Sequence, residues 1–262
     1  FAPACIRLAG LAAEDYFWGA AMPAPILDSV TGAIAAWSTG RQLSSTFSLA
    51  PADTAAGAYT LLRDQVGTRN AAASGSPAIG NGTINGLSYA KFDGANDCFT
   101  FAPLTLGSGD WTIFLAIGFT GAPAGALIGL SSSNTVVRHA STTGFSLQSD
   151  SAGPTSVSTS WVIAKGFHIL RIARDGTAGT VQIYQNGEAV GGGAAHALAG
   201  SFTFDRFGVQ HTNQFWSNMG FGECIVFSRL VSPSEASQVE TDMGTAWRSA
   251  VYIDATAGND AN

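Results

Sequence analysis

Trp111-Thr-Ile-Phe-Leu-Ala-Ile-Gly-Phe119 is the stretch that decides the fold. Apolar side chains alternate along it, so that an extended strand would carry one row of large residues on a single face: Trp111, Ile113, Leu115, Ile117 and Phe119. The opposite face also carries apolar residues, Phe114 and Ala116, beside Thr112 and Gly118. We therefore predict a β-strand that is covered on both sides.

Shorter segments with the same two-residue period surround this strand, separated by loops rich in Ser, Thr and Gly. Asn186-Gly187 closes a predicted hairpin, because both residue types tolerate the positive φ of a tight turn. The predicted strands cover residues 88–93, 126–130, 135–139, 144–148, 167–174, 180–185, 202–209 and 221–228. Many short strands at regular spacing indicate an all-β sandwich or jelly roll.

One helix is expected near the end of the chain. Ser232-Pro-Ser-Glu235 supplies an N-cap hydroxyl, a proline at the first helical position and a Glu placed to complete a capping box. The apolar residues that follow share one helical stripe, which we expect to pack on the sandwich: Ala236, Val239, Met243, Ala246 and Trp247.

Composition restricts the class of protein. Hydrophobic residues make up 46% of the 262 residues and charged residues only 11%, with 32 glycines and a net charge of −6. The acidic balance disfavours nucleic-acid binding, because a phosphate backbone needs a basic surface. No membrane insertion is expected, because Arg7, Glu14 and Asp15 interrupt the apolar N-terminal stretch. Few charges and many turns favour an extracellular or virion protein, such as a phage tail component.

The three cysteines, Cys5, Cys98 and Cys224, form no disulfide framework, since their number is odd and their spacing wide. We expect buried free thiols, with a Cys98–Cys224 bridge as the alternative.

Several motifs together resemble one family. The segment Gly86-Leu-Ser-Tyr-Ala-Lys-Phe-Asp-Gly-Ala-Asn-Asp97 is similar to a signature of concanavalin A-like, laminin-G-like jelly rolls in bacterial and phage proteins. The segments 111–117, 167–174, 181–190 and 222–235 are similar to later strands and the short helix of that family. The resemblance implies a concanavalin A-like jelly roll of two antiparallel sheets with one short C-terminal helix.

The two ends of the chain carry further resemblances. Residues 35–43 and 61–71 are similar to the opening of the arabinofuranosidase B catalytic domain, without its paired cysteines or acidic pair, which implies shared fold ancestry. Residues 251–262 resemble the first strand and turn of pectate-lyase and tailspike β-helices. We therefore expect a docking arm for other tail or virion proteins at 1–27, the jelly roll at 28–249, and a linker into a β-helix at 250–262. The full-length protein would then be a trimer.

Residues for catalysis are sparse. The sequence lacks the Glu-x-Asp-x-x-Glu run of jelly-roll glucanases, whose paired carboxylates cleave glycosidic bonds. Alternation in 221–228 places Glu223 on one face with Phe221, Ile225 and Phe227, either as a cleft carboxylate or paired with an arginine (Arg171, Arg174 or Arg206). Val209-Gln-His211 matches one strand motif of alginate lyases, and His211 is either a base or a loop histidine. No catalytic residue is assigned.

Glycan binding has better candidates. Sugar sites combine aromatic faces with amides and charged groups, and the segment 211–218 gathers these types in one loop: His211, Asn213, Gln214, Trp216 and Asn218. The alternative is that Phe215 and Trp216 plug the rim of the sandwich. Arg138 and His139 form a second candidate.

The family resemblance also implies a calcium site, for which Asp93 and Asp97 are the best matches; the alternative is that they fix their turn by hydrogen bonds. Together these features predict a non-catalytic glycan-recognition or attachment module of a phage tail fibre, a tailspike or a secreted polysaccharide-active protein. The alternatives are a structural virion adaptor, and a glycoside hydrolase or polysaccharide lyase.

Overall fold

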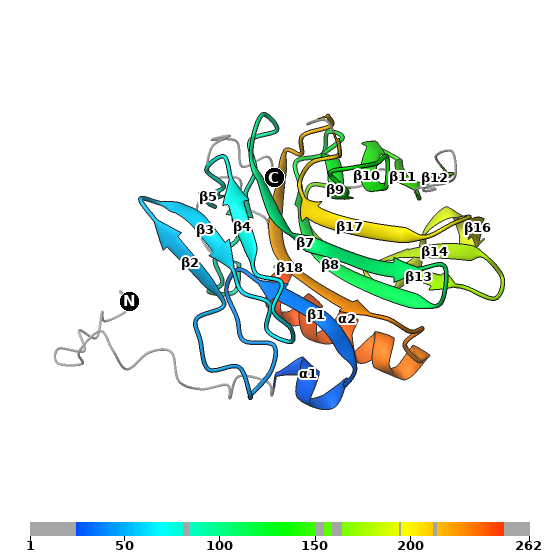
Figure 1. Cartoon of the computed structure of the whole chain (residues 1–262), viewed down its shortest axis with the longest axis horizontal. Helices are drawn as coiled ribbons and strands as arrows, with labels where there is room; N and C mark the ends of the chain where they lie inside the picture. The colour runs from blue at the N-terminus through cyan, green and yellow to red at the C-terminus, as the bar shows by residue number, and fades with distance from the viewer. Residues whose placement is uncertain are drawn as a thin grey trace, which may run out of the picture.

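Two antiparallel β-sheets face each other in the computed structural model, and one helix packs outside them (Figure 1). The structure describes residues 25–80, 84–149, 155–158, 164–193, 195–211 and 214–248. Residues 1–24 of the predicted arm and the predicted start of a β-helix lie outside these ranges. The observed architecture confirms the predicted all-β sandwich with a short C-terminal helix.

One sheet, here called the back sheet, contains the longest run of neighbouring strands. Its order is β12 (Thr155–Ser158), β11 (Gly144–Gln148), β10 (Val136–Ser141), β9 (Gly125–Gly129), β17 (Phe202–Phe207), β7 (Cys98–Gly107), β4 (Ala71–Ser74), β3 (Ala58–Leu62) and β2 (Ala52–Ala55).

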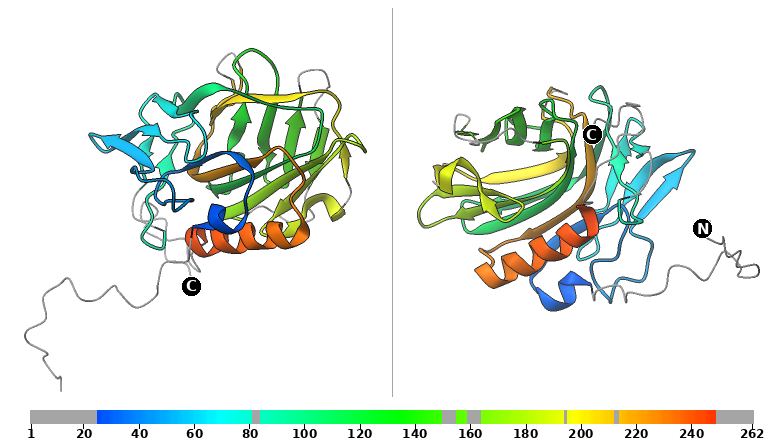
Figure 2. Two further views of the ribbon diagram at one scale, coloured as in Figure 1. Left: turned by 60° about the horizontal axis from the view of Figure 1, so that its bottom comes forward. Right: turned by 180° about the vertical axis from the view of Figure 1, so that it is seen from behind.

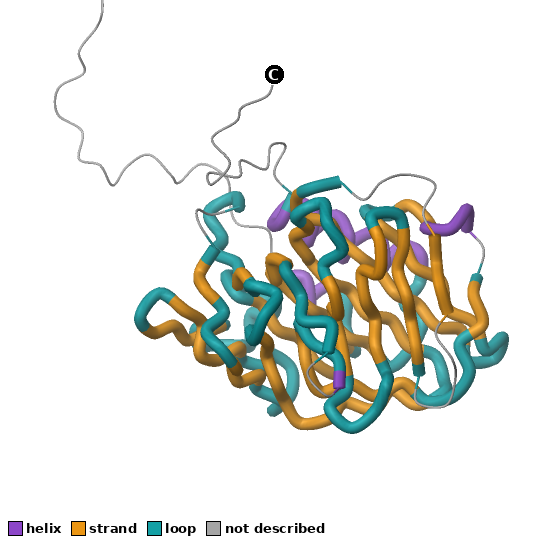
Figure 3. Tube along the Cα trace, turned by 90° about the horizontal axis from the view of Figure 1, so that it is seen from above, coloured by secondary structure: helices purple, strands orange, loops and turns teal. Residues whose placement is uncertain are grey.

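The other, the front sheet, has the order β1 (Ala33–Ser38), β18 (Met219–Phe227), β8 (Trp111–Phe119), β13 (Gly166–Asp175) and β14 (Thr180–Gln185). Two short strands share the outer edge of β14: β15 (Glu188–Ala189) and β16 (His196–Ala197), on either side of the 3₁₀ turn η1 (Val190–Gly193). A link through β5 (Ala78–Ile79) and β6 (Ala90–Lys91) connects β3 to β18. Figure 3 shows the loops gathered at the ends of the strands.

Strand β8 confirms the prediction that both of its faces are covered, since all nine residues are buried. Every second residue from Trp111 to Phe119 points into the core between the sheets. Phe114 and Ala116 point the other way, into a second apolar cluster beneath the helix. The sandwich therefore has three layers: back sheet, front sheet and helix.

Helix α2 (Pro233–Trp247) forms the third layer and begins with the predicted capping box. The Ser232 hydroxyl accepts from the backbone N–H of Glu235, and the Glu235 carboxylate accepts from the backbone N–H of Ser232. Its apolar stripe is buried on the outer face of β8 and β13, beside the single-turn helix α1 (Ile26–Ser29) (Figure 2). No helix in the described ranges is long and apolar enough to cross a bilayer.

Two glycines allow that second core to close. Phe167 lies over Gly118 and Gly220, where an added Cβ would come within 2.6 Å and 2.9 Å of its ring. Its other contacts are the rings of Trp247, stacked at 5.8 Å, and Tyr89. The Asn186-Gly187 turn is also as predicted, with φ of 55° and 88°.

In strand β18, the predicted common face of Phe221, Glu223, Ile225 and Phe227 is wrong for Phe221. A bulge between Phe221 and Glu223 shifts the register against β8, so that Phe221 joins the inter-sheet core while Ile225 and Phe227 face the helix. Phe221 therefore does not share a face with Glu223. The expected free thiols are observed for Cys98 and Cys224, both buried.

Candidate functional site

The loop from Gly208 to Asn218 joins the back sheet to the front sheet and is tied to strand β9. The backbone N–H of Ala126 donates to the Phe215 carbonyl at 2.9 Å, and that of Asn218 donates to the Ala124 carbonyl at 3.0 Å. The loop also closes on itself, because the backbone N–H of Ser217 donates to the Gly208 carbonyl at 2.8 Å. These bonds give the loop a fixed backbone on which side chains can be presented.

Phe215 is the unusual residue of this loop. Its φ is +52°, a left-handed conformation that is costly for a bulky residue, and its side chain is 48% exposed. The guanidinium carbon of Arg138 lies 4.5 Å from the centroid of its ring. Two stretches that the sequence analysis treated as separate candidates therefore meet at one surface. Phe215 does not plug the rim of the sandwich.

Arg138 reaches this surface from β10, where it lies directly opposite Ser146 of β11. None of the ion pairs among the described residues involves Arg138. Its Nε and the Ser146 hydroxyl are both buried without a hydrogen-bond partner. Buried donors of this kind are rare in native proteins and mark places where a further partner is expected.

The other predicted ligand residues fall into three groups. Gln214 and Asn218 are exposed on the loop, and His211 and Trp216 are half-buried in it. Asn213 lies outside the described residues. We call the surface formed by Arg138 and Phe215, with the exposed Gln214 next to Phe215 in the loop, the Arg138 surface. Asn218 lies apart from it, beside Gly94, where an added Cβ would be 3.3 Å from the Asn218 Cβ.

His139 does not belong to the Arg138 surface, because its side chain points into the core. It is 1% exposed, its ring centroid is 4.6 Å from that of Phe119, and its Nδ1 accepts from the backbone N–H of Ala124 at 3.0 Å. Burial, with a smaller contribution from His168, lowers its pKa from 6.5 to about 4. His139 is therefore a neutral core residue.

The two predicted calcium ligands hold the turn between β6 and β7. Asp93 Oδ1 accepts from the backbone N–H groups of Ala95 and Asn96, at 2.8 Å and 3.2 Å. Asp97 accepts from the backbone N–H of Ser76 at 2.7 Å and from that of Asp93 at 3.2 Å. Within the described ranges, no group of three or more His, Cys, Asp or Glu side chains gathers where it could hold a metal ion.

Glu223 is paired with an arginine, as one of its two interpretations required, but with Arg41. Arg41 donates to both carboxylate oxygens, Nε to Oε2 at 2.7 Å and an NH2 to Oε1 at 2.8 Å, while Trp247 Nε1 donates to Oε2 at 2.8 Å. Glu223 is fully buried, and Asp242 of α2 binds the same guanidinium. Its carboxylate therefore anchors the helix and does not face a cleft.

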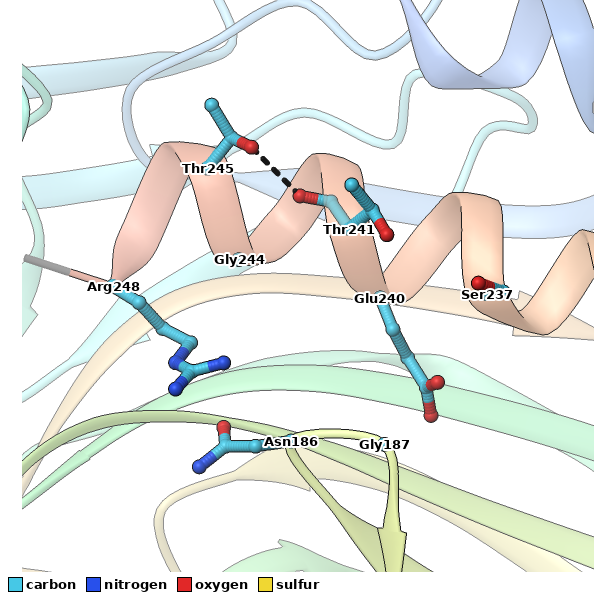
Figure 4. Close-up of a pocket in the computed structure, with 8 residues that line it drawn as sticks. All are labelled: Asn186, Gly187, Ser237, Glu240, Thr241, Gly244, Thr245 and Arg248. Carbon is cyan, nitrogen blue, oxygen red and sulfur yellow. Dashed lines mark hydrogen bonds between the residues drawn. The ribbon is translucent and has the colours of Figure 1, made fainter.

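A cavity of about 610 Å³ lies between α2 and the Asn186-Gly187 turn (Figure 4). No local sequence pattern indicates this cavity, because its two walls are far apart in the chain. The helix contributes the rest of its lining: Ser237, Glu240, Thr241, Gly244, Thr245 and Arg248. In Figure 4 the side chains of Glu240 and Arg248 extend toward the turn, with Gly244 between them.

No protein-family model matches the sequence, and comparison with curated proteins found no match. Solved structures do resemble the fold. A sialidase of Trypanosoma rangeli, in complex with a 2,3-difluoro sugar acid, is 11% identical with a TM-score of 0.52, over 83% of this chain and 34% of its own.

Two botulinum neurotoxin structures are also similar. The serotype D ligand binding domain in complex with N-acetylneuraminic acid is 10% identical with a TM-score of 0.54, over 80% of this chain and 50% of its own. A structure of botulinum neurotoxin type C, whose cell entry is dependent upon interaction with two ganglioside molecules, is 13% identical with a TM-score of 0.53, over 81% of this chain and 51% of its own. The present chain thus spans about a third to a half of these proteins, and the likeness supports the sandwich fold.

Proposed function

We propose that this chain is a glycan-recognition module and that the Arg138 surface holds an anionic saccharide. The observation that carries the proposal is Phe215, a large aromatic residue that is kept in a left-handed conformation and half-exposed beneath a guanidinium that forms no ion pair with any described residue. Strain of this kind persists where the surrounding structure imposes it, and it clusters at binding sites.

The groups at this surface suit a sugar acid. A guanidinium presents a planar fork of donors that matches a carboxylate, and Arg138 has no competing carboxylate within ion-pair distance in the described part of the chain. The exposed ring of Phe215 offers an apolar face for the C–H groups of a pyranose. The amide of Gln214, exposed next to Phe215 in the loop, can both donate to and accept from hydroxyl groups.

The structural relatives agree with this ligand class, since one of them is in complex with N-acetylneuraminic acid and another depends upon gangliosides. We further propose that the domain is concanavalin A-like and serves attachment in a phage tail fibre, a tailspike or a secreted polysaccharide-active protein. Few charges, many turns and the resemblance of residues 251–262 to a β-helix support this context. Trimerisation would strengthen weak single sites by avidity.

The test is a glycan array followed by calorimetric titration of the best acidic oligosaccharide. Arg138→Gln removes a charge-assisted pair and should weaken binding about 10- to 100-fold. Phe215→Gly removes the ring and relieves the left-handed strain, so binding should fall while stability is kept or raised. Lys91→Gln removes an exposed positive charge elsewhere and should leave the affinity unchanged.

A carboxyl-reduced form of the same oligosaccharide distinguishes a sugar acid from a neutral sugar. We expect it to bind the unaltered protein as weakly as the acidic form binds Arg138→Gln. Equal affinity for both forms would contradict the role of Arg138, and unchanged affinity in Phe215→Gly would contradict the placement of the site.

A further inference from the structure

We propose that the cavity between α2 and the Asn186-Gly187 turn is a second saccharide site, which takes a neutral, hydroxyl-rich oligosaccharide. It lies on the helix-covered front sheet, whereas Arg138 belongs to the back sheet, so the two sites are separate (Figure 1). Its volume of about 610 Å³ is within the range of small-ligand pockets.

Glu240 is held in one orientation, with its side chain reaching toward Gly187 (Figure 4). Its Oε1 accepts from Arg171 Nε at 2.8 Å, and the Arg171 guanidinium carbon lies 3.5 Å from the centroid of the Tyr184 ring. Because the ion pair uses Oε1, Oε2 remains as an acceptor near Gly187, where an added Cβ would lie 3.6 Å from it. The carboxylate is therefore positioned before any ligand arrives.

Asn186 is fixed equally firmly at the other wall. Its Oδ1 accepts from the backbone N–H of Ile169 at 3.0 Å, and its Nδ2 lies 3.0 Å from His168 Nδ1. Burial lowers the pKa of His168, which keeps the ring neutral, so that Nε2 donates to the Ala164 carbonyl and Nδ1 is the acceptor. The Gln185 side-chain amide nitrogen also lies 3.0 Å from this Nδ1, so the two amides share it. Figure 4 shows the amide oxygen of Asn186 on the side of α2, so its second lone pair can accept from a ligand hydroxyl.

Gly244 opens the space between these groups. Glu240, Gly244 and Arg248 lie four residues apart along one stripe of α2, so the helix presents a carboxylate, a gap and a guanidinium in a row (Figure 4). A Cβ at Gly244 would have only the Arg248 side chain near it, at 3.7 Å. Glycine is unfavourable inside a helix, and here its effect is to leave room.

The lining selects the ligand. Each lining residue is glycine or has a polar side chain, so an apolar ligand would leave these groups unpaired. A ligand carboxylate would meet Glu240, and a ligand cation would meet Arg248. Hydroxyl groups both donate and accept, so a neutral saccharide satisfies the carboxylate, the amide and the guanidinium together. Without an exposed aromatic platform, the affinity should be millimolar.

Nuclear magnetic resonance titration with cellotriose, maltotriose and triacetylchitotriose tests the site, with backbone amide shifts as the readout. We expect at least one trisaccharide to shift the amides of Asn186, Gly187 and Gly244. Gly244→Leu fills the gap while adding a better helix former, so the shifts should vanish and the unfolding midpoint should not fall. Arg248→Met should weaken binding roughly tenfold through the loss of one charged hydrogen bond.

Gln238→Leu is the matched control, because it places the same side chain at an exposed position of α2 outside the cavity lining. It should leave the shifts intact. No shift with any of the three sugars, or shifts that persist in Gly244→Leu, would overturn the proposal. Amides of Phe215 and Ser217 report separately on the Arg138 surface, so failure of one site is distinguishable from failure of the other.

Discussion

Replacing Glu223 with alanine should destabilise the fold more than any surface substitution. The change removes two hydrogen bonds from Arg41 and one from Trp247 at a carboxylate that is fully buried. Burial opposes the charge of Arg41, but Coulomb attraction to Glu223 and hydrogen bonds outweigh it and raise the Arg41 pKa above its ordinary value. Without Glu223, Asp242 is the one carboxylate among the described residues that still pairs with that guanidinium.

The expected cost is about 3–5 kcal/mol, the range found when one partner of a buried ion pair is removed. That is a large part of the roughly 5–15 kcal/mol by which domains are stable. Glu223→Gln keeps an acceptor for Trp247 and should cost less. In a double-mutant cycle with Arg41→Ala, the two losses should be less than additive by about 1–3 kcal/mol, because each single change strands the other group.

Urea unfolding followed by tryptophan fluorescence measures these values, since Trp37, Trp111 and Trp247 are all buried. A loss below about 1 kcal/mol for Glu223→Ala would refute the anchoring role. If Glu223 were instead a cleft carboxylate, Glu223→Gln would leave stability unchanged and abolish the release of reducing ends from a polysaccharide.

Three further outcomes are expected. Because the pKa of His139 falls from 6.5 to about 4 on folding, the unfolded chain binds more protons between these values; stability is then lost as pH falls through that window, by about 3 kcal/mol across it, and the slope should flatten in His139→Gln. Burial raises the pKa of Cys98 and Cys224, so in a Cys5→Ser background Ellman's reagent should modify neither thiol until urea unfolds the protein; rapid labelling in buffer would contradict their burial. Ser232→Ala removes the N-cap of α2 and should cost about 1 kcal/mol in urea unfolding, whereas Ser232→Asp should restore most of it.

Much of the fold could be predicted from local patterns in the sequence. Alternation in Trp111–Phe119 was sufficient for β8, and Ser232 with Glu235 defined the start of α2, because each signal lies within a few residues. The strands before residue 85 were not identified individually, since Ala71–Ser74 and similar Ala-rich segments lack a clear polar and apolar alternation. A bulge at Gly222 reverses which face of β18 the following side chains occupy, and no local sequence pattern indicates this bulge.

The candidate sites depend on contacts between residues that are far apart in the chain, so less of them could be predicted from the sequence. It singled out Arg138 and the loop at 211–218 by residue type, but not that Arg138 stacks on Phe215. Arg41 lies 182 residues from Glu223, so no spacing rule could pair them. The cavity at α2 likewise needs the tertiary placement of the Asn186-Gly187 turn against the helix.

The position of β18 in the front sheet has a consequence for synthesis. It lies between β1 and β8, so the middle of that sheet is supplied by residues 219–227, close to the end of the described chain. Until residues 219–227 have been synthesised, no strand connects β1 to β8, and the apolar face that α2 covers is exposed to water. Folding should therefore complete late, after a long interval in which the nascent chain depends on chaperones or on slow elongation to avoid aggregation.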